Sequence, residues 1–346
     1  MAADAVPRRV TIGDVAQHAN VSTAAVSKVL RNAYGSSPAM RARVRQAIDE
    51  LGYRPHAAAR GMRGQTYTVG VMIPDLRNPF FPELIEGIGQ QLAGTDYQIL
   101  LGPGGSVAET QARSTDAMID RRMDGIIMIA PMMPQRRLEE TARAVPIVVI
   151  GRHGKSAHYD SVVDDDVTGA ALIVDHLADL GHRRIAHIEH KVSGRGMPTT
   201  LPQTVRGEGY RQAMRRRGLA EYIDVVASTY SEEGGYSAAR AMLARPAAQR
   251  PTAIFAGADV AAIGVLNALR EAGLRVPDDI SVTGYDNTAI AALEPISLTS
   301  VDQDGHLMGN NAARLLLERI EAKRQRSVLY SLAPMLVPRR STAPPP

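Results

Sequence analysis

The sequence predicts a small all-α head followed by an α/β body of two lobes. Near the N-terminus two short amphipathic helical patterns flank a tight turn, and from residue 67 onwards short apolar runs alternate with helical patterns. The first arrangement is typical of a helical hairpin and the second of parallel sheets flanked by helices. The chain of 346 residues is too long for one ordinary core. The body of roughly 275 residues suits two lobes better than one.

The helical hairpin occupies residues 10–30. We predict a helix over 12–19, a turn at Asn20-Val21 and a second helix with Ser22 as its N-cap. Apolar residues recur at helical spacing on the second helix and leave a small, polar and basic outer face, formed by Thr23, Ala24, Ser27 and Lys28. This pattern indicates a helix-turn-helix whose second helix suits the major groove of DNA, although two helices alone are equally compatible with any small helical hairpin.

A third helix is predicted to begin at Ser37-Pro38, with serine as N-cap and proline at the first helical position. Gly52 supplies its C-terminal stop. Its apolar face consists of Met40, Val44, Ala47, Ile48 and Leu51, and its outward-facing basic residues are Arg41, Arg43 and Arg45. Three helices in about 40 residues make a minimal DNA-binding domain with a small core.

The charge of the chain is concentrated in this head. Residues 1–64 carry ten basic and four acidic groups, a net charge of +6, whereas the remaining 30 basic and 32 acidic groups leave the body near neutral. A basic module on a neutral body is the electrostatic pattern of a nucleic-acid-binding head attached to a second domain.

The composition excludes several other classes of protein. No apolar run reaches the roughly 18 residues of a membrane span, and the first nine residues lack the apolar core of a secretory signal. The absence of cysteine excludes disulfides, thiolate catalysis and cysteine-based zinc sites. We therefore expect a cytoplasmic protein without contact with a membrane.

Several motifs, in order along nearly the whole chain, resemble the lactose-repressor (LacI/GalR) family of bacterial transcription factors. They are Val10-Thr-Ile-Gly-Asp-Val-Ala16, Val21-Ser-Thr-Ala-Ala-Val-Ser-Lys-Val-Leu30, Leu51-Gly-Tyr-Arg-Pro55, Gly70-Val-Met-Ile-Pro-Asp-Leu-Arg-Asn-Pro-Phe-Phe81, Leu180-Gly-His-Arg-Arg-Ile-Ala186, Gly284-Tyr-Asp286 and Leu298-Thr-Ser-Val-Asp-Gln-Asp304. The resemblance implies a body with a periplasmic-binding-protein-like (type I) fold, in which the chain crosses between the lobes three times.

For the head, the resemblance implies that the second helix enters the major groove and that a hinge helix, resembling residues 55–62, enters the minor groove. From composition alone, residues 53–64 are better interpreted as an ordinary linker. Met62 stands where the family has a wedging leucine, and methionine also serves as an apolar wedge. The expected DNA-binding residues are Thr11, Ser22, Thr23, Ala24, Ser27, Lys28, Arg41, Tyr53, Arg54, His56, Ala59 and Met62.

The expected domains follow from the same comparison. They are a flexible N-terminus (1–9), a helix-turn-helix domain (10–54), a hinge helix and linker (55–66), an effector-binding and dimerisation domain (67–340) and a disordered tail (341–346). The first lobe is expected at about 67–168 and 300–323, and the second at about 169–299 and 324–340.

Predicted strands cover 68–73, 97–101, 125–129, 147–150, 185–189, 253–256 and 280–285, with amphipathic helices that include 107–119, 167–180 and 260–272. Ligands of such sheets bind beyond the carboxyl ends of the strands. The expected effector-binding residues are Asp75, Asn78, Phe81, Arg206, Asp259, Asp286 and Gln303. Aspartate caps, a surface arginine and a core phenylalanine are the alternative interpretations of these positions.

Polar groups around an aromatic platform suit a polyhydroxylated ligand, so a sugar or sugar derivative is expected and a nucleobase is less favoured. Two departures from the family pattern reduce the number of polar side chains that can hold a ligand. A larger effector, a phosphorylated effector and the absence of any effector therefore remain as alternatives. Gly257-Ala258-Asp259 lacks the asparagine that commonly precedes this aspartate, and Gly151 stands where some members carry an acidic ligand contact.

Other motifs give weaker signals. Gly102-Pro-Gly-Gly-Ser106 lacks the lysine of a phosphate-binding P-loop. His182, His187 and His190 lack the spacing of a zinc site, and no catalytic constellation stands apart from the expected cleft. We expect no cofactor, no metal and no enzymatic activity.

The sequence therefore predicts a homodimeric, ligand-responsive transcription factor, a repressor that binds a pseudo-palindromic operator in double-stranded DNA. A sugar-binding transport protein would have the same body, but it needs an export signal and has no basic head. A sugar-processing enzyme is the other alternative, and hydrolysis of a candidate ligand would identify it.

Overall fold

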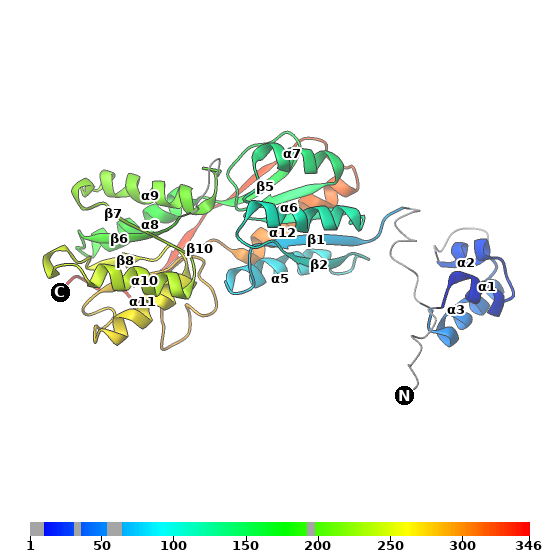
Figure 1. The fold of residues 1–346 in the computed structure, drawn as a ribbon, viewed down its shortest axis with the longest axis horizontal. Helices are drawn as coiled ribbons and strands as arrows, with labels where there is room; N and C mark the ends of the chain where they lie inside the picture. The colour runs from blue at the N-terminus through cyan, green and yellow to red at the C-terminus, as the bar shows by residue number, and fades with distance from the viewer. Residues whose placement is uncertain (1–9, 31–35, 54–63, 192–197) are drawn as a thin grey trace, which may run out of the picture. The chain divides into compact units, whose positions relative to one another are not determined.

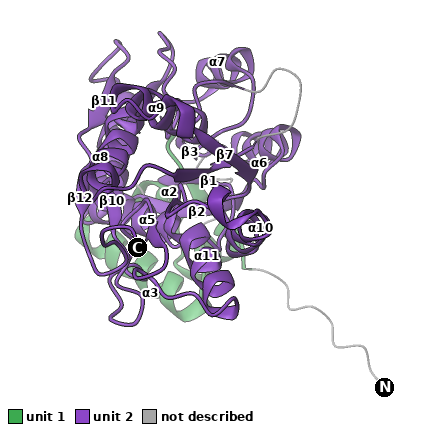
Figure 2. Ribbon diagram, turned by 90° about the vertical axis from the view of Figure 1, so that its left-hand side faces the viewer, with its two compact units in different colours: residues 1–66 green, residues 67–346 purple. Residues whose placement is uncertain are grey.

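A computed structural model describes residues 10–30, 36–53, 64–191 and 198–346. The chain forms two compact units, residues 1–66 and 67–346, which are coloured separately in Figure 2. The expected flexible N-terminus (1–9) and residues 55–63 of the expected hinge helix lie outside the described residues.

The first unit contains the expected three helices, α1 (Ile12–His18), α2 (Thr23–Leu30) and α3 (Pro38–Leu51). Thr11 and Asp14 form a reciprocal capping box at the start of α1. Asn20, in the turn between α1 and α2, has a φ of 50°, and Gly52 ends α3 with a φ of 60°. Both residues therefore adopt the left-handed backbone that the sequence predicts for them.

Apolar faces of the three helices form one small core, made of Val15, Ala16, Ala19, Val26, Val29, Val44 and Ala47. Ser27 lies on the inner side of α2 and is only 8% exposed, so the expectation that it belongs to the outer face is wrong. A helix of 3.6 residues per turn places Ser27 next to Val26, at the border of the face that packs on the core. Leu30 is one of the apolar residues that recur at helical spacing on α2 and is therefore expected inside, but it is 37% exposed.

The second unit begins with a lobe built on a six-stranded sheet of order β11-β5-β4-β3-β1-β2 (Figure 1). Its strands are β1 (Thr68–Ile73), β2 (Gln98–Pro103), β3 (Gly125–Ile129), β4 (Ile147–Ile150), β5 (Asp160–Asp164) and β11 (Leu329–Leu332). All neighbouring strands are parallel. Helices α5 (Phe80–Leu92) and α12 (Gly305–Ile320) pack on one face, and α6 (Ala108–Asp120) and α7 (Gln135–Ala144) on the other.

The other lobe has a four-stranded parallel sheet of order β7-β6-β8-β9. Its strands are β6 (Ile185–His190), β7 (Asp224–Ser228), β8 (Ala253–Phe255) and β9 (Ser281–Thr283). Helices α10 (Glu232–Leu243) and α11 (Asp259–Glu271) cover one face, and α8 (Asp166–Asp179) and α9 (Pro202–Arg216) cover the other. The two lobes lie side by side in Figure 1. This architecture confirms the predicted fold class.

The chain crosses between the lobes three times, after β5, after β10 (Ser300–Asp302) and after β11. Strand β10 pairs antiparallel with β12 (Met335–Val337), which forms a two-stranded ribbon at the crossing. The expected lobe boundary at 324 is therefore wrong for β11, because this strand pairs with β5 in the sheet of the first lobe. Its four residues, Leu-Tyr-Ser-Leu, are too short a pattern for the sequence to assign to either sheet.

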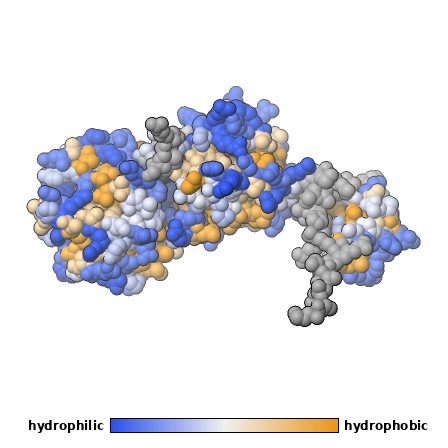
Figure 3. All heavy atoms as spheres, viewed as in Figure 1, coloured by the Kyte–Doolittle hydropathy of each residue, from blue (hydrophilic) through white to orange (hydrophobic). Residues whose placement is uncertain are grey.

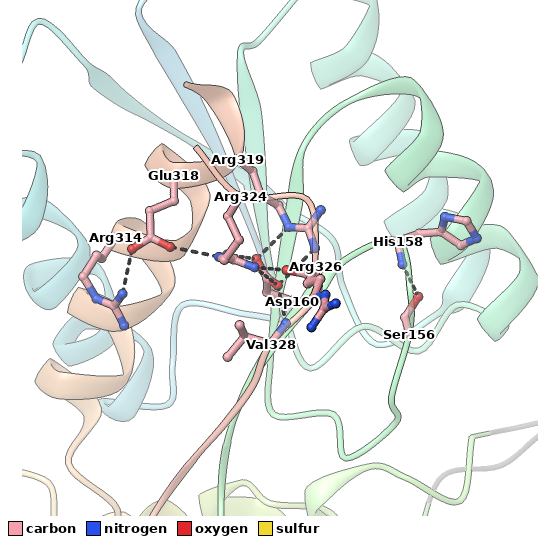
Figure 4. Close-up of polar contacts among 9 residues, drawn as sticks. All are labelled: Ser156, His158, Asp160, Arg314, Glu318, Arg319, Arg324, Arg326 and Val328. Atoms are coloured by element: carbon pink, nitrogen blue, oxygen red, sulfur yellow. Dashed lines mark hydrogen bonds and ion pairs between the residues drawn. The ribbon is translucent and has the colours of Figure 1, made fainter. Parts of the chain in front are cut away.

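A buried carboxylate holds the segment before β11 against the first lobe (Figure 4). Asp160 is fully buried and accepts hydrogen bonds from Arg319 at 2.6 and 3.0 Å, from Arg324 at 2.7 and 3.0 Å, and from the Val328 amide at 2.6 Å. Glu318 accepts from Arg324 at 3.0 Å. Both carboxylate oxygens of Asp160 accept hydrogen bonds from charged or amide donors. These hydrogen bonds compensate the free-energy cost of burying the carboxylate.

The C-terminal segment is ordered, so the expectation of a disordered tail from Ser341 is wrong. Ser341 is 2% exposed; its hydroxyl accepts from the Thr299 amide at 2.8 Å and donates to the Val282 carbonyl at 2.6 Å. The Val282 amide in turn donates to the Ser341 carbonyl at 2.9 Å. The segment thus provides partners for backbone groups beside β9, which composition does not reveal. No helix of the described residues is long and apolar enough to span a membrane.

Candidate DNA-binding face and ligand cleft

The outer face of α2 consists of small and basic side chains. Thr23, Ala24 and Lys28 are exposed, and Ser22 accepts the Ala25 amide at 3.2 Å, as expected for an N-cap. Thr11 is exposed and its hydroxyl donates to Asp14 at 2.7 Å. Thr23, Ala24 and Lys28 thus lie at the surface of the head, where the sequence predicts the DNA-binding face.

The remaining expected DNA contacts divide into two groups. Arg41 is half-buried and donates through Nε to Ser36 at 2.8 Å, and Tyr53 is half-buried against the head's core. Arg54, His56, Ala59 and Met62 lie outside the described residues.

A cavity of about 540 Å³ lies between the two lobes. The loop between β1 and α5 contributes Asp75, Arg77 and Asn78, and the second lobe contributes Tyr230, Ser231, Glu232, Glu233, Tyr236 and Val260. This volume is within the range of small-molecule sites. Of the expected effector residues, Asp75 and Asn78 line this cavity directly.

A buried polar cluster adjoins the cavity through Asn78 and Tyr230. Arg206 on α9 is 3% exposed, and its guanidinium lies 5.9 Å from the centre of the Tyr230 ring and 3.4 Å from that of Tyr285. Asp286 is 4% exposed and accepts from Gln303 at 2.6 Å and from the side chain of Asn78. Arg206, Asp286 and Gln303 are thus gathered next to one wall of the cavity.

Electrostatics in the cluster follow from its burial. Burial lowers the pKa of Arg206, but the charge of Asp166 outweighs this effect and raises the pKa well above its ordinary value. Burial raises the pKa of Asp286 well above its ordinary value, although Arg206 acts in the opposite direction. Asp286 also has a φ of 107°, a left-handed conformation that is rare for a residue with a side chain and that is often found at functional sites.

Two expected effector residues have structural partners instead. Asp259 is 1% exposed, and its carboxylate accepts from Thr288 at 2.7 and 3.0 Å and from Ser300 at 2.6 Å, which joins α11 to β10. Phe81 packs against the core of the first lobe. Asp75 also accepts the Arg77 amide at 2.6 Å and so shapes the loop that lines the cavity.

Four residues of the cluster are not among the effector-binding residues expected from the sequence, namely His153, Asp166, Tyr230 and Tyr285. Asp166 belongs to a run of three aspartates, Asp164 to Asp166, at the start of α8. Such a run is more typical of helix capping, and Asp165 is indeed the N-cap. The aspartate run and the motif Gly284-Tyr-Asp286 are the sequence signals that point to this cluster.

The histidines near β6 have structural roles. His187 is fully buried between the rings of Tyr210 and Phe255, at 5.2 and 4.4 Å, and His190 accepts the Tyr230 amide at 2.9 Å. Burial lowers the pKa of His187 to about 3. Within the described residues, no group of three or more histidines and carboxylates is placed to hold a metal ion.

A helix-turn-helix head and a two-lobed body with a cavity between its lobes define a ligand-binding transcriptional regulator. Residues 11–56 match the family model "Bacterial regulatory proteins, lacI family", and residues 174–342 match "Periplasmic binding protein-like domain". The ribose operon repressor of Escherichia coli (strain K12) is 33% identical over 336 residues, which cover 96% of this chain and 99% of that protein. The chain therefore belongs to the lacI family of bacterial regulatory proteins.

Two further relatives support this assignment. The HTH-type transcriptional repressor PurR of Erwinia tasmaniensis is 35% identical over 342 residues, which cover 96% of this chain and 97% of that protein. A LacI family transcriptional regulator from Enterococcus faecium, solved with bound ribose, is 28% identical with a TM-score of 0.70 and covers 80% of this chain and 99% of its own.

Proposed function

We propose that this protein represses transcription by binding a pseudo-palindromic operator as a homodimer, and that a small molecule between its lobes changes its affinity for DNA. One observation supports this most strongly. The same chain carries an exposed helix-turn-helix face and a ligand-sized cavity lined from both lobes. A ligand that binds two arrangements of the lobes with different affinity shifts the equilibrium between them. This shift changes the affinity of the head for DNA.

A carbohydrate or carbohydrate derivative is the ligand class that the cavity favours. Tyr230 and Tyr236 offer aromatic rings, and Asp75, Asn78 and Ser231 offer hydrogen-bonding groups for hydroxyls. The Enterococcus faecium relative was solved with ribose.

We propose that the protein has no enzymatic activity. The relatives named above are transcriptional repressors, and the buried carboxylates of the cluster are engaged in hydrogen bonds. Hydrolysis of a bound sugar by the purified protein would overturn this proposal. Since its proposed partner is double-stranded DNA, we propose that the protein acts in the cytoplasm.

The proposed DNA contact of α2 is tested by Lys28→Ala. We expect operator affinity to fall by about tenfold and the slope of log affinity against log salt to decrease by about one, because one phosphate or base contact with a cation is lost. Fluorescence anisotropy with a labelled operator at several salt concentrations measures both quantities.

Lys155→Ala is the matched control, since Lys155 is an exposed lysine of the second unit. It should leave the affinity and the salt slope unchanged. Equal behaviour of the two variants would contradict a DNA contact by Lys28.

A further inference from the structure

Arg206, the cation of the cluster beside the cavity, already has an internal anionic partner. Its Nε and Nη2 donate to Oδ1 of Asp166 at 2.9 and 2.7 Å, and its Nη1 donates to the Gly257 carbonyl. The face of the guanidinium is covered by the Tyr285 ring at 3.4 Å. All three guanidinium nitrogens thus donate hydrogen bonds, and the directly bonded carboxylate of Asp166 compensates the positive charge.

Asp166 is itself held from both lobes. It is 1% exposed and lies at the first crossing of the chain, where β5 ends and α8 begins. Its Oδ2 lies 2.7 Å from Nε2 of His153, which follows β4 in the first lobe. Arg206 approaches Oδ1 from α9 in the second lobe. The carboxylate is therefore fixed in place rather than free to move aside.

Acidic side chains outnumber basic ones in the lining of the cavity. Three carboxylates, Asp75, Glu232 and Glu233, line it against one guanidinium, that of the exposed Arg77. Tyr230 contributes a buried hydroxyl for which no hydrogen-bond partner exists among the described residues. An acidic ligand would enter a site whose buried cation is already neutralised, whereas hydroxyl or amine donors would find acceptors.

We propose that Asp166 is a specificity-determining residue that occupies Arg206 and thereby excludes anionic ligands, such as phosphorylated or carboxylated sugars, from the inter-lobe cavity. The ligand is a hydroxyl-rich molecule without an acidic group. This inference rests on the proposed function, because it concerns the selectivity of the same cavity. It also excludes a phosphorylated effector, which was one of the alternatives compatible with the sequence.

Inorganic phosphate tests the proposal without knowledge of the natural ligand. In the full-length Asp166→Ala variant, Arg206 loses its partner and becomes a buried cation with an adjacent space, so phosphate should raise the melting temperature in a saturable manner. We expect the phosphate concentration at half-maximal effect to be lower than in the wild type by about tenfold or more. Sodium chloride at matched ionic strength separates this effect from general screening.

Two further variants make the result specific. Asp166→Asn preserves the shape of the side chain and removes its charge, so it should also gain phosphate binding and provides the test if Asp166→Ala does not fold. The double variant Asp166→Ala, Arg206→Met removes both charges together and should lose the gain.

Phosphate binding by the wild type that is as tight as in the Asp166 variants, or a gain that persists without Arg206, would overturn the proposal. So would a folded Asp166→Asn protein that gains nothing. These assays contain no DNA, whereas operator binding by the wild type tests the proposed function separately, so that failure of one is distinguishable from failure of the other.

Discussion

Asp160 and Asp164 lie at opposite ends of strand β5, and the pKa values of their carboxyl groups are shifted in opposite directions. Burial raises the pKa of Asp160, but hydrogen bonds from Arg324 and Arg319 outweigh it and hold the pKa below its ordinary value. Burial and the charge of Asp166 raise the pKa of Asp164 to about 7. Asp164 has one oxygen bonded to the Tyr285 hydroxyl and another without a partner among the described residues. Donors from two arginines therefore outweigh burial at Asp160, whereas burial and a neighbouring negative charge prevail at Asp164.

The raised pKa of Asp164 predicts a specific pH dependence of stability. The folded state retains a proton that the unfolded chain releases near its ordinary pKa, so this contribution to stability is complete below about pH 4 and is lost as the pH rises through about 7. Asp164→Asn, which mimics the protonated group, should lose less free energy of unfolding between about pH 5 and about pH 8 than the wild type. Urea denaturation at several pH values measures the difference.

Asp96→Asn, an exposed aspartate of the same lobe, is the control and should follow the wild-type profile. If the profile of Asp164→Asn also parallels that of the wild type, the carboxyl group of Asp164 is ionised in the folded protein and the prediction is wrong.

At the scale of elements, the C-terminal segment completes the second lobe. Beyond the bonds of Ser341, the Ala343 amide donates to the Ser281 hydroxyl at 3.1 Å, and the Ala343 carbonyl lies 2.8 Å from Nε2 of His182. These contacts join the end of the chain to β9 and to the loop before β6. The segment therefore acts as an additional edge of the four-stranded sheet, although it is too short to form a regular strand.

Ser341→Ala should reduce the free energy of unfolding by about 1–3 kcal/mol, because the buried Thr299 amide and Val282 carbonyl both lose their side-chain partner. Ser237→Ala, at an exposed position of α10, is the matched control and should change stability by no more than about 0.5 kcal/mol. Chemical denaturation of both variants measures the difference. A Ser341→Ala protein as stable as the control would mean that water replaces the lost hydroxyl.

At the scale of the whole molecule, the six-stranded sheet has two edges with different surfaces. Strand β2 forms one edge and exposes Leu100 and Leu101 at 49% and 47%. Apolar side chains gather along the lower edge of this lobe in Figure 3, over α5 and β2. An exposed apolar edge strand is an unfavourable surface for a protein without a partner, and we propose that the second subunit of the dimer covers it.

Replacing Leu100 and Leu101 together by aspartate should therefore produce a monomer that still folds, since neither side chain belongs to a core cluster. Operator affinity should fall by about tenfold or more, because a single head contacts one half-site. Sedimentation velocity and operator binding measure the two effects. Leu329→Asp, at the opposite edge of the same sheet, is the control; a dimeric double variant would place the interface elsewhere.

The sequence by itself determined the local structure of this protein. Periodicity and capping residues identify α1, α2 and α3, and the apolar runs identify β3 and β4 to the residue, because these signals depend on neighbours in the chain. The motif order also determined the family. Arg206, Asp286 and Gln303 were placed near the cleft by the same resemblance, and the structure brings them together.

Only the tertiary structure decided which of these polar groups are available to a ligand. Asp166 is 40 residues from Arg206 in sequence, and nothing in a run of three aspartates distinguishes a cap from the partner of a distant arginine. The inner bonds of Asp259 and the ordered Ser341 have the same cause. Each depends on partners from other elements, and a buried polar group is positioned by the hydrogen bonds that compensate its loss of water.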